Sequence, residues 1–227
     1  MLITFCNTKG GVGKSTLASH LAIWLHDKGY RVALLDADEQ GTSSNWVRVA
    51  EPRITVCVAT TMDLIQAATT QLTKDHDVVV GDSAGEDGKA SQTITLLSDL
   101  AIIPLQPSRP DIRALNNGLK AIRLAQQITG GKRPEAILVL NVVSKRDVQA
   151  RKLKEQLTTF KVTVAHSEIR RLNAFRDSCD KSVTRMAGDE GKEATRDLDA
   201  LFNEVVMPRL NKIEAKSANN WHGVGNG

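Results

Sequence analysis

Short apolar runs alternate with helical patterns along most of this chain. Seven runs have the composition of buried strands, at residues 2–6, 31–35, 54–58, 78–81, 100–104, 136–140 and 161–165. Between most of them, apolar residues recur at spacings of three and four, as in 112–122, which follows Pro110-Asp111, and in 150–157. Apolar strands that alternate with helices are typical of parallel sheets covered on both faces. We therefore predict an α/β fold with a mostly parallel sheet and helices on both faces.

Length and composition indicate one domain. The 227 residues, 41% hydrophobic and 25% charged, are ordinary for a soluble globular protein. We assign residues 1–213 to a single domain and predict that the polar, glycine-rich residues 214–227 form a disordered tail. No apolar stretch approaches the roughly 18 residues that cross a bilayer, and the first strand begins at once, so we expect a cytoplasmic protein without a secretory signal.

The three cysteines, Cys6, Cys57 and Cys179, are far apart and have no metal-ligand spacing. An odd number of scattered cysteines is typical of buried, unpaired thiols in a reducing compartment. An iron–sulfur reductase needs paired cluster cysteines, and these three do not provide them.

Charge is unevenly distributed along the chain. Residues 132–176 contain 11 Lys/Arg and 4 Asp/Glu, a balance of +7. Because the whole chain carries +4, the remainder carries −3. A basic segment in a mildly acidic protein is typical of a polyanion-binding surface, although a solvated helix face without a partner has the same composition.

The segment 7–16, Asn-Thr-Lys-Gly-Gly-Val-Gly-Lys-Ser-Thr, lies between the first strand and a helix and predicts a phosphate-binding loop (P-loop). Its glycines let backbone N–H groups converge on phosphate oxygens. Lys14 supplies charge for the β/γ-phosphates, and the Ser15 hydroxyl suits Mg²⁺. Lys9 is a second lysine, and Thr8 replaces the usual first glycine. We assign nucleotide binding to Lys9, Gly10, Gly11, Val12, Gly13, Lys14, Ser15 and Thr16.

Carboxylates follow two other predicted strands. The strand 31–35 runs into Asp36-Ala37-Asp38-Glu39-Gln40, and 78–81 runs into Asp82-Ser83-Ala84-Gly85. The carboxyl edge of a parallel sheet is where ligands bind, so these side chains can serve a divalent ion and a water molecule. Alone, each would be read as a solvated strand end, but after a P-loop we assign them to nucleotide chemistry.

The sequence Lys-Gly-Gly-Val-Gly-Lys-Ser-Thr resembles the deviant Walker A box of the ParA/MinD-type ATPases, which have a P-loop NTPase fold. In that family the early lysine reaches across a dimer interface to the partner's nucleotide, which implies this role for Lys9. Residues 36–40 resemble the switch I box Asp-x-Asp-Pro-Gln, with Glu39 in place of proline, and Asp82 resembles the Walker B aspartate. The resemblance implies that Asp38 polarises the attacking water and joins Lys9 and Lys14 in catalysis. It also implies that Mg²⁺ is held by Ser15, Asp36 and Asp82.

The resemblance continues beyond the P-loop. Asn141 ends the strand 136–140, where an amide can pair with an adenine edge as the family's asparagine does, or can simply cap the strand. Residues 102–108 resemble the family signature Val-Ile-Ile-Pro-Val-x-Pro-Ser. Residues 167–183 resemble its C-terminal Ile-x-x-Arg element, and which arginine corresponds is left open. As contacts to DNA phosphates we assign Arg151, Lys152, Lys154, Arg170, Arg171 and Arg176.

These features favour a short ParA-type partition ATPase without the N-terminal helix-turn-helix of longer members. The resemblance implies that ATP closes two subunits into a homodimer that binds duplex DNA without sequence preference and associates with the nucleoid. Weak ATP hydrolysis, accelerated by a ParB-like or cargo-adaptor protein, would release the DNA and position a plasmid or other cargo.

Parts of the sequence are also compatible with other functions. An ATPase of conjugative DNA transfer and a metabolic nucleotide-dependent ligase on the same scaffold remain alternatives, and a non-catalytic scaffold would require that ATP turnover be absent. A membrane-cycling ATPase of the MinD kind needs an amphipathic C-terminal helix, and residues 217–227 have no apolar face, so we expect no membrane partner.

Overall fold

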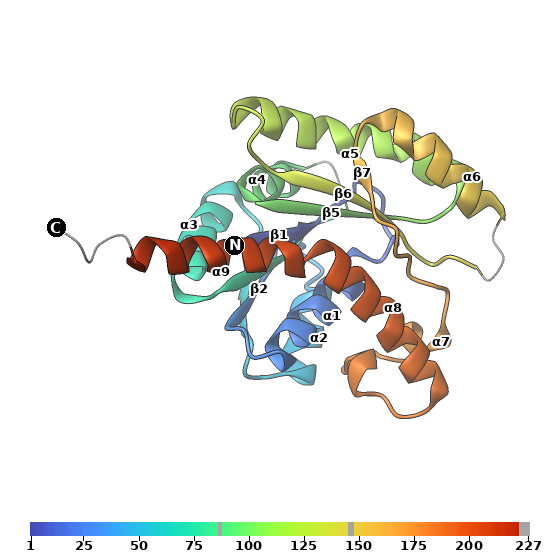
Figure 1. Cartoon of the computed structure of the whole chain (residues 1–227), viewed down its shortest axis with the longest axis horizontal. Coiled ribbons are helices and arrows are strands. Elements are labelled where there is room, and N and C mark those ends of the chain that lie inside the picture. Colours follow the sequence, from blue (N-terminus) through green and yellow to red (C-terminus); the bar gives the residue numbers. More distant parts are fainter. Residues whose placement is uncertain (86–87, 145–147, 223–227) are drawn as a thin grey trace.

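The computed structural model describes residues 1–85, 88–144 and 148–222. Within them, one parallel sheet of seven strands has the order β3-β2-β4-β1-β5-β6-β7 (Figure 1). The strands are β1 (Leu2–Phe5), β2 (Val32–Asp36), β3 (Thr55–Val58), β4 (Val78–Asp82), β5 (Leu100–Leu105), β6 (Glu135–Leu140) and β7 (Thr163–Val164). All seven predicted strands and the parallel α/β fold are confirmed.

The strand β7 is shorter than the predicted run 161–165. Lys161 has a φ of 55°, in the left-handed region that an extended strand does not use. The strand also lies at the edge of the sheet, where it pairs only with β6. Its pairing is therefore limited to Thr163 and Val164.

Helices cover both faces of the sheet (Figure 1). They are α1 (Lys14–Asp27), α2 (Thr42–Ala50), α3 (Met62–Asp75), α4 (Lys89–Leu97), α5 (Arg109–Ile128), α6 (Val148–Leu157), α7 (Asn173–Arg176), α8 (Asp189–Val205) and α9 (Met207–His222). The two predicted helical patterns, 112–122 and 150–157, lie in α5 and α6.

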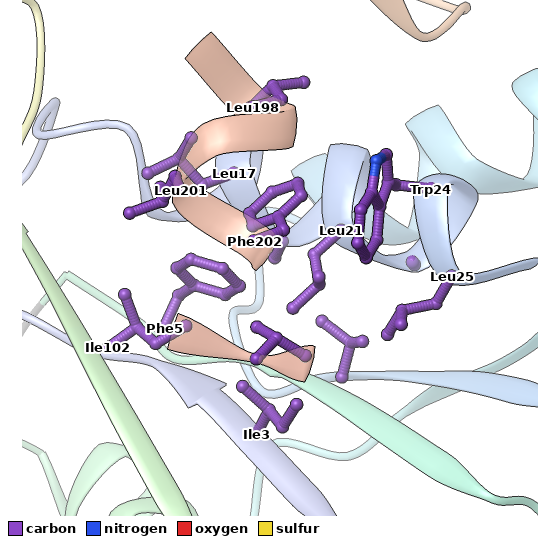
Figure 2. Close-up of a cluster of buried hydrophobic side chains, with 14 of the residues drawn as sticks. Ile3, Phe5, Leu17, Leu21, Trp24, Leu25, Ile102, Leu198, Leu201 and Phe202 are labelled. Atoms are coloured by element: carbon purple, nitrogen blue, oxygen red, sulfur yellow. The ribbon is translucent and has the colours of Figure 1, made fainter. Parts of the chain in front are cut away.

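The larger half of the core lies between the sheet and α1, α2 and α8. Alternate strand residues such as Ile3 and Phe5 point to this face, where Leu17 and Leu21 of α1 and Leu201 of α8 cover them (Figure 2). Trp24 packs edge-on against Phe202 with ring centroids 5.4 Å apart. The period of two along the strands directs the neighbouring residues to the opposite face.

Those neighbouring residues form two further clusters on the other face. Leu35 and Val79 pack beneath α3 and α4, where Ile65 and Ile94 cover them. A second group from β5 and β6 packs beneath α5 and α6, and includes Leu138. The central strands are buried on both faces, so the functional edge of the sheet is held by a rigid platform.

The C-terminal helix α9 continues through His222, where a disordered tail is expected from residue 214. Between Pro208 and His222 the chain has no glycine or proline, and it contains helix-forming Leu, Lys, Glu and Ala residues. The glycines that suggested disorder begin only at Gly223, and residues 223–227 lie outside the described residues.

Candidate nucleotide and metal site

The P-loop connects the carboxyl end of β1 to the first turn of α1. Gly11 and Gly13 have φ values of 74° and 95°, a backbone region that side chains with a Cβ rarely adopt. A Cβ at Gly13 would also lie 2.2 Å from Nδ2 of Asn141. Gly13 caps α1, so the loop directs the free N–H groups of the helix toward the site, a geometry that favours anions.

Lys14 is folded back onto the loop from which it comes. Its side chain is buried, and its Nζ donates a hydrogen bond to the carbonyl of Lys9 at 3.3 Å. Burial lowers the pKa of the Lys14 ammonium, and the charges of Asp82 and Asp38 oppose that shift. The Lys9 side chain is partly buried, and its backbone N–H donates to Oδ1 of Asn7 at 3.0 Å. The Lys14 ammonium and the backbone of Lys9 thus meet at the start of the P-loop.

Asp36 and Asp82 are direct neighbours across the strands β2 and β4, and both are fully buried. Asp36 accepts backbone hydrogen bonds from Asp38 at 3.0 Å and from Ser44 at 2.9 Å. Its two oxygens therefore hold the turn after β2 and the first part of α2. The predicted metal role of Asp36 competes with these two bonds.

Both carboxylate oxygens of Asp82 have no hydrogen-bond partner within the described part of the chain. Burial, together with the nearby charge of Asp36, raises the pKa of Asp82 to about 7. The neighbouring hydroxyls of Ser15 and Ser43 and the ammonium of Lys14 lower it only in part, and neither hydroxyl reaches hydrogen-bonding geometry. A buried carboxylate of this kind needs a cation or a proton.

The donor set of this site fits Mg²⁺. Hard cations of this size take carboxylate, hydroxyl and water oxygens and are often completed by phosphate. Asp82 and Ser15 supply a carboxylate and a hydroxyl beside the phosphate loop. No group of three or more His, Cys, Asp or Glu side chains that could hold a metal occurs among residues 1–85, 88–144 and 148–222. An ion here would therefore complete its shell with nucleotide and water.

Asp38 lies in a tight turn at the edge of the site. Its Oδ1 accepts from the N–H of Gln40 at 3.0 Å, and its carbonyl accepts from the N–H of Gly41 at 3.0 Å. Gly41 has a φ of 61° and caps α2. The turn forms with Glu39 at the position of the family's proline, and Asp38 remains partly exposed.

Asn141 is buried against the P-loop. Its Nδ2 donates to the carbonyl of Val12 at 2.7 Å, and its Oδ1 accepts from the N–H of Val142 at 2.9 Å. Val142 has a φ of 57°, an outlier for a β-branched residue. Asn141 therefore braces the loop, and its contact with adenine stays a prediction.

A cleft of about 1080 Å³ extends from the P-loop past Asn141. Gly11, Gly13 and Thr16 line one wall, and the segment from Ile169 to Arg176 lines the other. Its size suits a nucleoside bound beyond the phosphates. Gln106 also braces this edge, because its Nε2 donates to the carbonyl of Gly11 at 2.9 Å.

The six cations predicted to contact DNA have different surroundings. Arg170 forms ion pairs with Asp197 at 2.8 Å and with Glu193 at 3.1 Å, both from α8. Lys154 pairs with Glu168 at 3.2 Å. Arg171 and Arg176 are exposed, although Arg176 has Asp177 at 3.4 Å. The side chains of Arg151 and Lys152 lie outside the described ones.

The charge count over 132–176 therefore overstates the free positive charge. The acids that neutralise Arg170 lie at positions 193 and 197, beyond that window. Arg170, Arg171 and Arg176 also line the same cleft as the P-loop glycines. Arg170 is better described as part of the cleft wall than as a DNA contact.

Sequence reasoning missed a buried histidine that joins three parts of the site. His20 of α1 lies 3.3 Å from the hydroxyls of both Ser178 and Ser182, and its ring packs edge-on against Trp46 of α2. Burial lowers the pKa of His20 to about 3, so the ring is neutral. The helix after the P-loop is thereby attached to α2 and to the cleft wall, and no sequence motif signals this.

The thiols are unpaired, but only Cys6 is buried. Cys57 is half-buried and Cys179 is exposed, so the expectation of three buried thiols is wrong for these two. Cys57 lies on β3 at the edge of the sheet, and Cys179 lies in a surface turn.

The described helices are all too short or too polar to span a bilayer.

Comparison with known proteins agrees with this geometry. A family model described as the CobQ/CobB/MinD/ParA nucleotide binding domain matches residues 3–184. The chain is 28% identical over 211 residues to the maintenance of carboxysome distribution protein A of Halothiobacillus neapolitanus, covering 90% of this chain and 95% of that protein. It is 36% identical over 118 residues to protein virC1 of Rhizobium radiobacter, about half of each chain (49% and 51%).

Solved structures share the fold at low sequence identity. An ATP complex of a Cyanothece McdA variant has a TM-score of 0.74 at 11% identity, covering 90% of this chain and 95% of that one. A plasmid partition protein from Borrelia burgdorferi bound to AMPPNP has a TM-score of 0.67 at 19% identity, covering 90% and 99%. With its P-loop fold and the matching family model, the chain belongs to the CobQ/CobB/MinD/ParA family of nucleotide-binding domains.

Proposed function

We propose that this protein is a weak ATP hydrolase that requires Mg²⁺ and closes into an ATP-dependent homodimer to position a cargo over DNA. The observation that carries this proposal is the buried Lys14, which is folded onto the Lys9 carbonyl near a carboxylate of Asp82 that has no hydrogen-bond partner in the described part of the chain. Lys9 is the second lysine of the same loop. One lysine suffices for a single P-loop, whereas two opposed triphosphates need additional positive charge.

Phosphate binding begins at the loop backbone. The N–H groups of residues 10–16 and the start of α1 take the phosphate oxygens, and Lys14 exchanges the Lys9 carbonyl for the β/γ-phosphates. Ser15 and Asp82, with Asp36 beside them, would hold the metal ion. When bound, Mg²⁺ neutralises charge on the phosphates. Asn141 keeps the loop curled by its bond to Val12.

Hydrolysis depends on a correctly placed water molecule. Asp38 is partly exposed at the mouth of the site, and its turn is fixed by bonds to Gln40 and Gly41. A carboxylate there accepts a hydrogen bond from the attacking water and orients that water toward the γ-phosphate. Lys9 of one subunit neutralises charge on the nucleotide of the other.

DNA binding is supported by the exposed Arg171 and Arg176 and by the positive charge that segment 132–176 keeps although Arg170 and Lys154 are in ion pairs. Dimerisation would double these contacts on one face, so ATP would control affinity without base readout. A ParB-like or adaptor protein would accelerate hydrolysis and release the dimer from the nucleoid. The cargo is a plasmid, conjugative DNA or a protein assembly. A relative named for carboxysome distribution and a structural neighbour named for plasmid partition support the protein assembly and the plasmid.

Sedimentation velocity tests the dimer. The wild-type protein should be monomeric with ADP and dimeric with Mg²⁺ and a non-hydrolysable ATP analogue. Lys14→Ala should lose nucleotide, Lys9→Ala should bind it without forming a stable dimer, and the exposed control Lys74→Ala should behave as wild type. A wild-type protein that stays monomeric with the analogue would instead favour the ligase alternative.

A further inference from the structure

A groove between α4 and α5 exposes apolar side chains to solvent. Met62 at the start of α3, Leu96 of α4, and Leu124 and Ile128 of α5 line a space of about 530 Å³. Seven large hydrophobic side chains are exposed in the described part of the chain, and three of them lie here: Met62 (48%), Leu124 (54%) and Ile128 (63%). Such clustering on one surface is typical of an interaction site.

The groove continues inward to the P-loop. A narrow inner space, with room for about one water molecule, shares Gln92 and Ala121 with it and reaches Asn7, Thr8 and Ser83. Small residues on both helices, among them Gly118 and Ser91, leave this space between α4 and α5. Both helices lie on the face of the sheet opposite α1 and α2 (Figure 1).

The helices that form the groove carry almost only positive charge. Lys89 lines the groove, and Lys120 lies one helical turn before Leu124. The sequences of α4 and α5 contain a single acidic residue, Asp111, near the first turn of α5. Asp63, which follows Met62, is the acidic residue at the start of α3. The rim along α4 and α5 therefore complements an acidic partner.

We propose that this groove docks an amphipathic helix with an apolar face and acidic flanks, supplied by a partner protein. Two packed helices that leave an apolar groove bind such segments through anchors at i, i+3 or i+4, and i+7. The nine residues of α4 give a groove about 13 Å long, which is two turns of the bound helix.

A helix bound in this groove would affect the conformation of the phosphate site. The inner space touches Thr8 and Ser83, which lie directly beside Lys9 and Asp82 in the sequence. Because this inner space is narrow, an anchor side chain bound in the groove presses on its lining, and so on the start of the P-loop and on the end of β4. This coupling rests on the proposed ATPase cycle, whereas the binding itself does not.

Fluorescence anisotropy without nucleotide tests the binding. The probes are three synthetic helical peptides: one with a leucine face and glutamate flanks, one with lysine in place of glutamate, and a scrambled acidic peptide. The acidic amphipathic peptide should bind at least about tenfold more tightly than the other two. Leu124→Ser and Ile128→Ser should each weaken it by about tenfold, the loss expected for one buried anchor.

A matched control is available on the other face of the sheet. Val49 of α2 is 62% exposed, close to the 63% of Ile128, and Val49→Ser should leave binding unchanged. Lys89→Glu should reduce the preference for the acidic peptide. Equal binding of the acidic and lysine peptides, or full binding by Ile128→Ser, would overturn the proposal. A change in the self-association of nucleotide-free Ile128→Ser would also overturn it, because the groove would then join two copies of this chain.

The coupling has its own readout. The acidic peptide should change ATP turnover of the wild-type protein and not that of Ile128→Ser. Peptide binding without any effect on an active ATPase would contradict the coupling alone. A protein without ATPase activity that still binds the peptide would contradict the proposed function and leave the docking site supported.

Discussion

Asp36 and Asp82 face each other across adjacent parallel strands, yet only Asp36 has hydrogen-bond partners in the described structure. Asp36 uses both oxygens to hold the turn and α2, whereas Asp82 is buried with neither oxygen bonded. The two aspartates thus have different roles in the site. Asp36 shapes the loop that carries Asp38, and Asp82 is the carboxylate left for a cation.

We predict opposite effects on stability when each aspartate loses its charge. Without nucleotide, Asp82→Asn should raise the free energy of unfolding by on the order of 1–3 kcal/mol, because it removes an unpaired buried charge. Asp36→Asn should lower it by a similar amount, because an amide NH₂ cannot accept the backbone bond that the lost oxygen accepted. Urea denaturation at pH 7 measures both, and a stabilised Asp36→Asn would contradict the assignment.

The same carboxylate predicts a dependence of stability on pH. The folded-state pKa of Asp82 is raised to about 7, so the folded protein binds this proton more tightly than the unfolded chain. The stabilisation is complete below about pH 4 and is lost as pH rises through 7, by on the order of 2–4 kcal/mol. The difference between wild type and Asp82→Asn, followed by denaturation without Mg²⁺, should change across this window. A constant difference would show that Asp82 titrates normally.

Asp38→Ala should slow ATP hydrolysis more than tenfold while leaving ATP affinity nearly unchanged. Removing a water-orienting carboxylate raises the barrier without disturbing the phosphate loop, so kcat falls selectively. Single-turnover hydrolysis measures this, with the adjacent exposed Glu39→Ala as control. Wild-type turnover by Asp38→Ala would reduce Asp38 to a structural residue of the turn.

Gly13→Ala and Gly10→Ala should differ strongly. A Cβ at Gly13 meets Asn141 at 2.2 Å and requires a φ of 95°, whereas a Cβ at Gly10 meets nothing within 4 Å. Gly13→Ala should cost at least about 2 kcal/mol in stability and Gly10→Ala less than about 1 kcal/mol. Thermal denaturation of the nucleotide-free proteins compares them, and equal costs would contradict the close packing of Asn141 on the loop.

DNA affinity of the ATP form should depend steeply on salt and little on sequence. Arg171→Ala and Arg176→Ala should each lower the slope of log K against log salt by about one unit. Arg170→Ala should instead destabilise the fold, because it leaves Asp197 and Glu193 unpaired. Anisotropy over a salt series with ATP, ADP and no nucleotide measures this. Equal affinity in all three states would contradict control by nucleotide.

Much of the fold could be read from the sequence because the central strands are buried on both faces. Continuous apolar runs such as 78–81 have no other stable place than the middle of a parallel sheet. The P-loop and the aspartates at strand ends were likewise predictable, since glycine spacing and strand order place them at one edge. The end of α9 was not, because polar composition alone does not exclude a helix.

Pairing between distant side chains could not be predicted. The local charge count predicted that the guanidinium of Arg170 is free. In the structure Glu193 and Asp197, which lie 23 and 27 positions further along the chain, neutralise it. The bond of Asn141 to Val12 spans 129 positions, and the contacts of His20 with Ser178 and Ser182 span 158 and 162. Such contacts depend on how α1, β6 and α8 come together, and periodicity carries no information about that.

In the proposed dimer Lys9 acts on the nucleotide of the other subunit, and a mixture of two inactive variants tests this role. In a heterodimer of Lys9→Ala and Asp38→Ala, the site of the Lys9→Ala subunit has its own Asp38 and receives Lys9 from its partner. A mixed dimer keeps one of the two Lys9 side chains at its interface and has one complete site. An equimolar mixture should therefore regain ATP turnover, and the value for random pairing of subunits is roughly a quarter of wild type. Turnover equal to the average of the two variants measured alone would contradict the account.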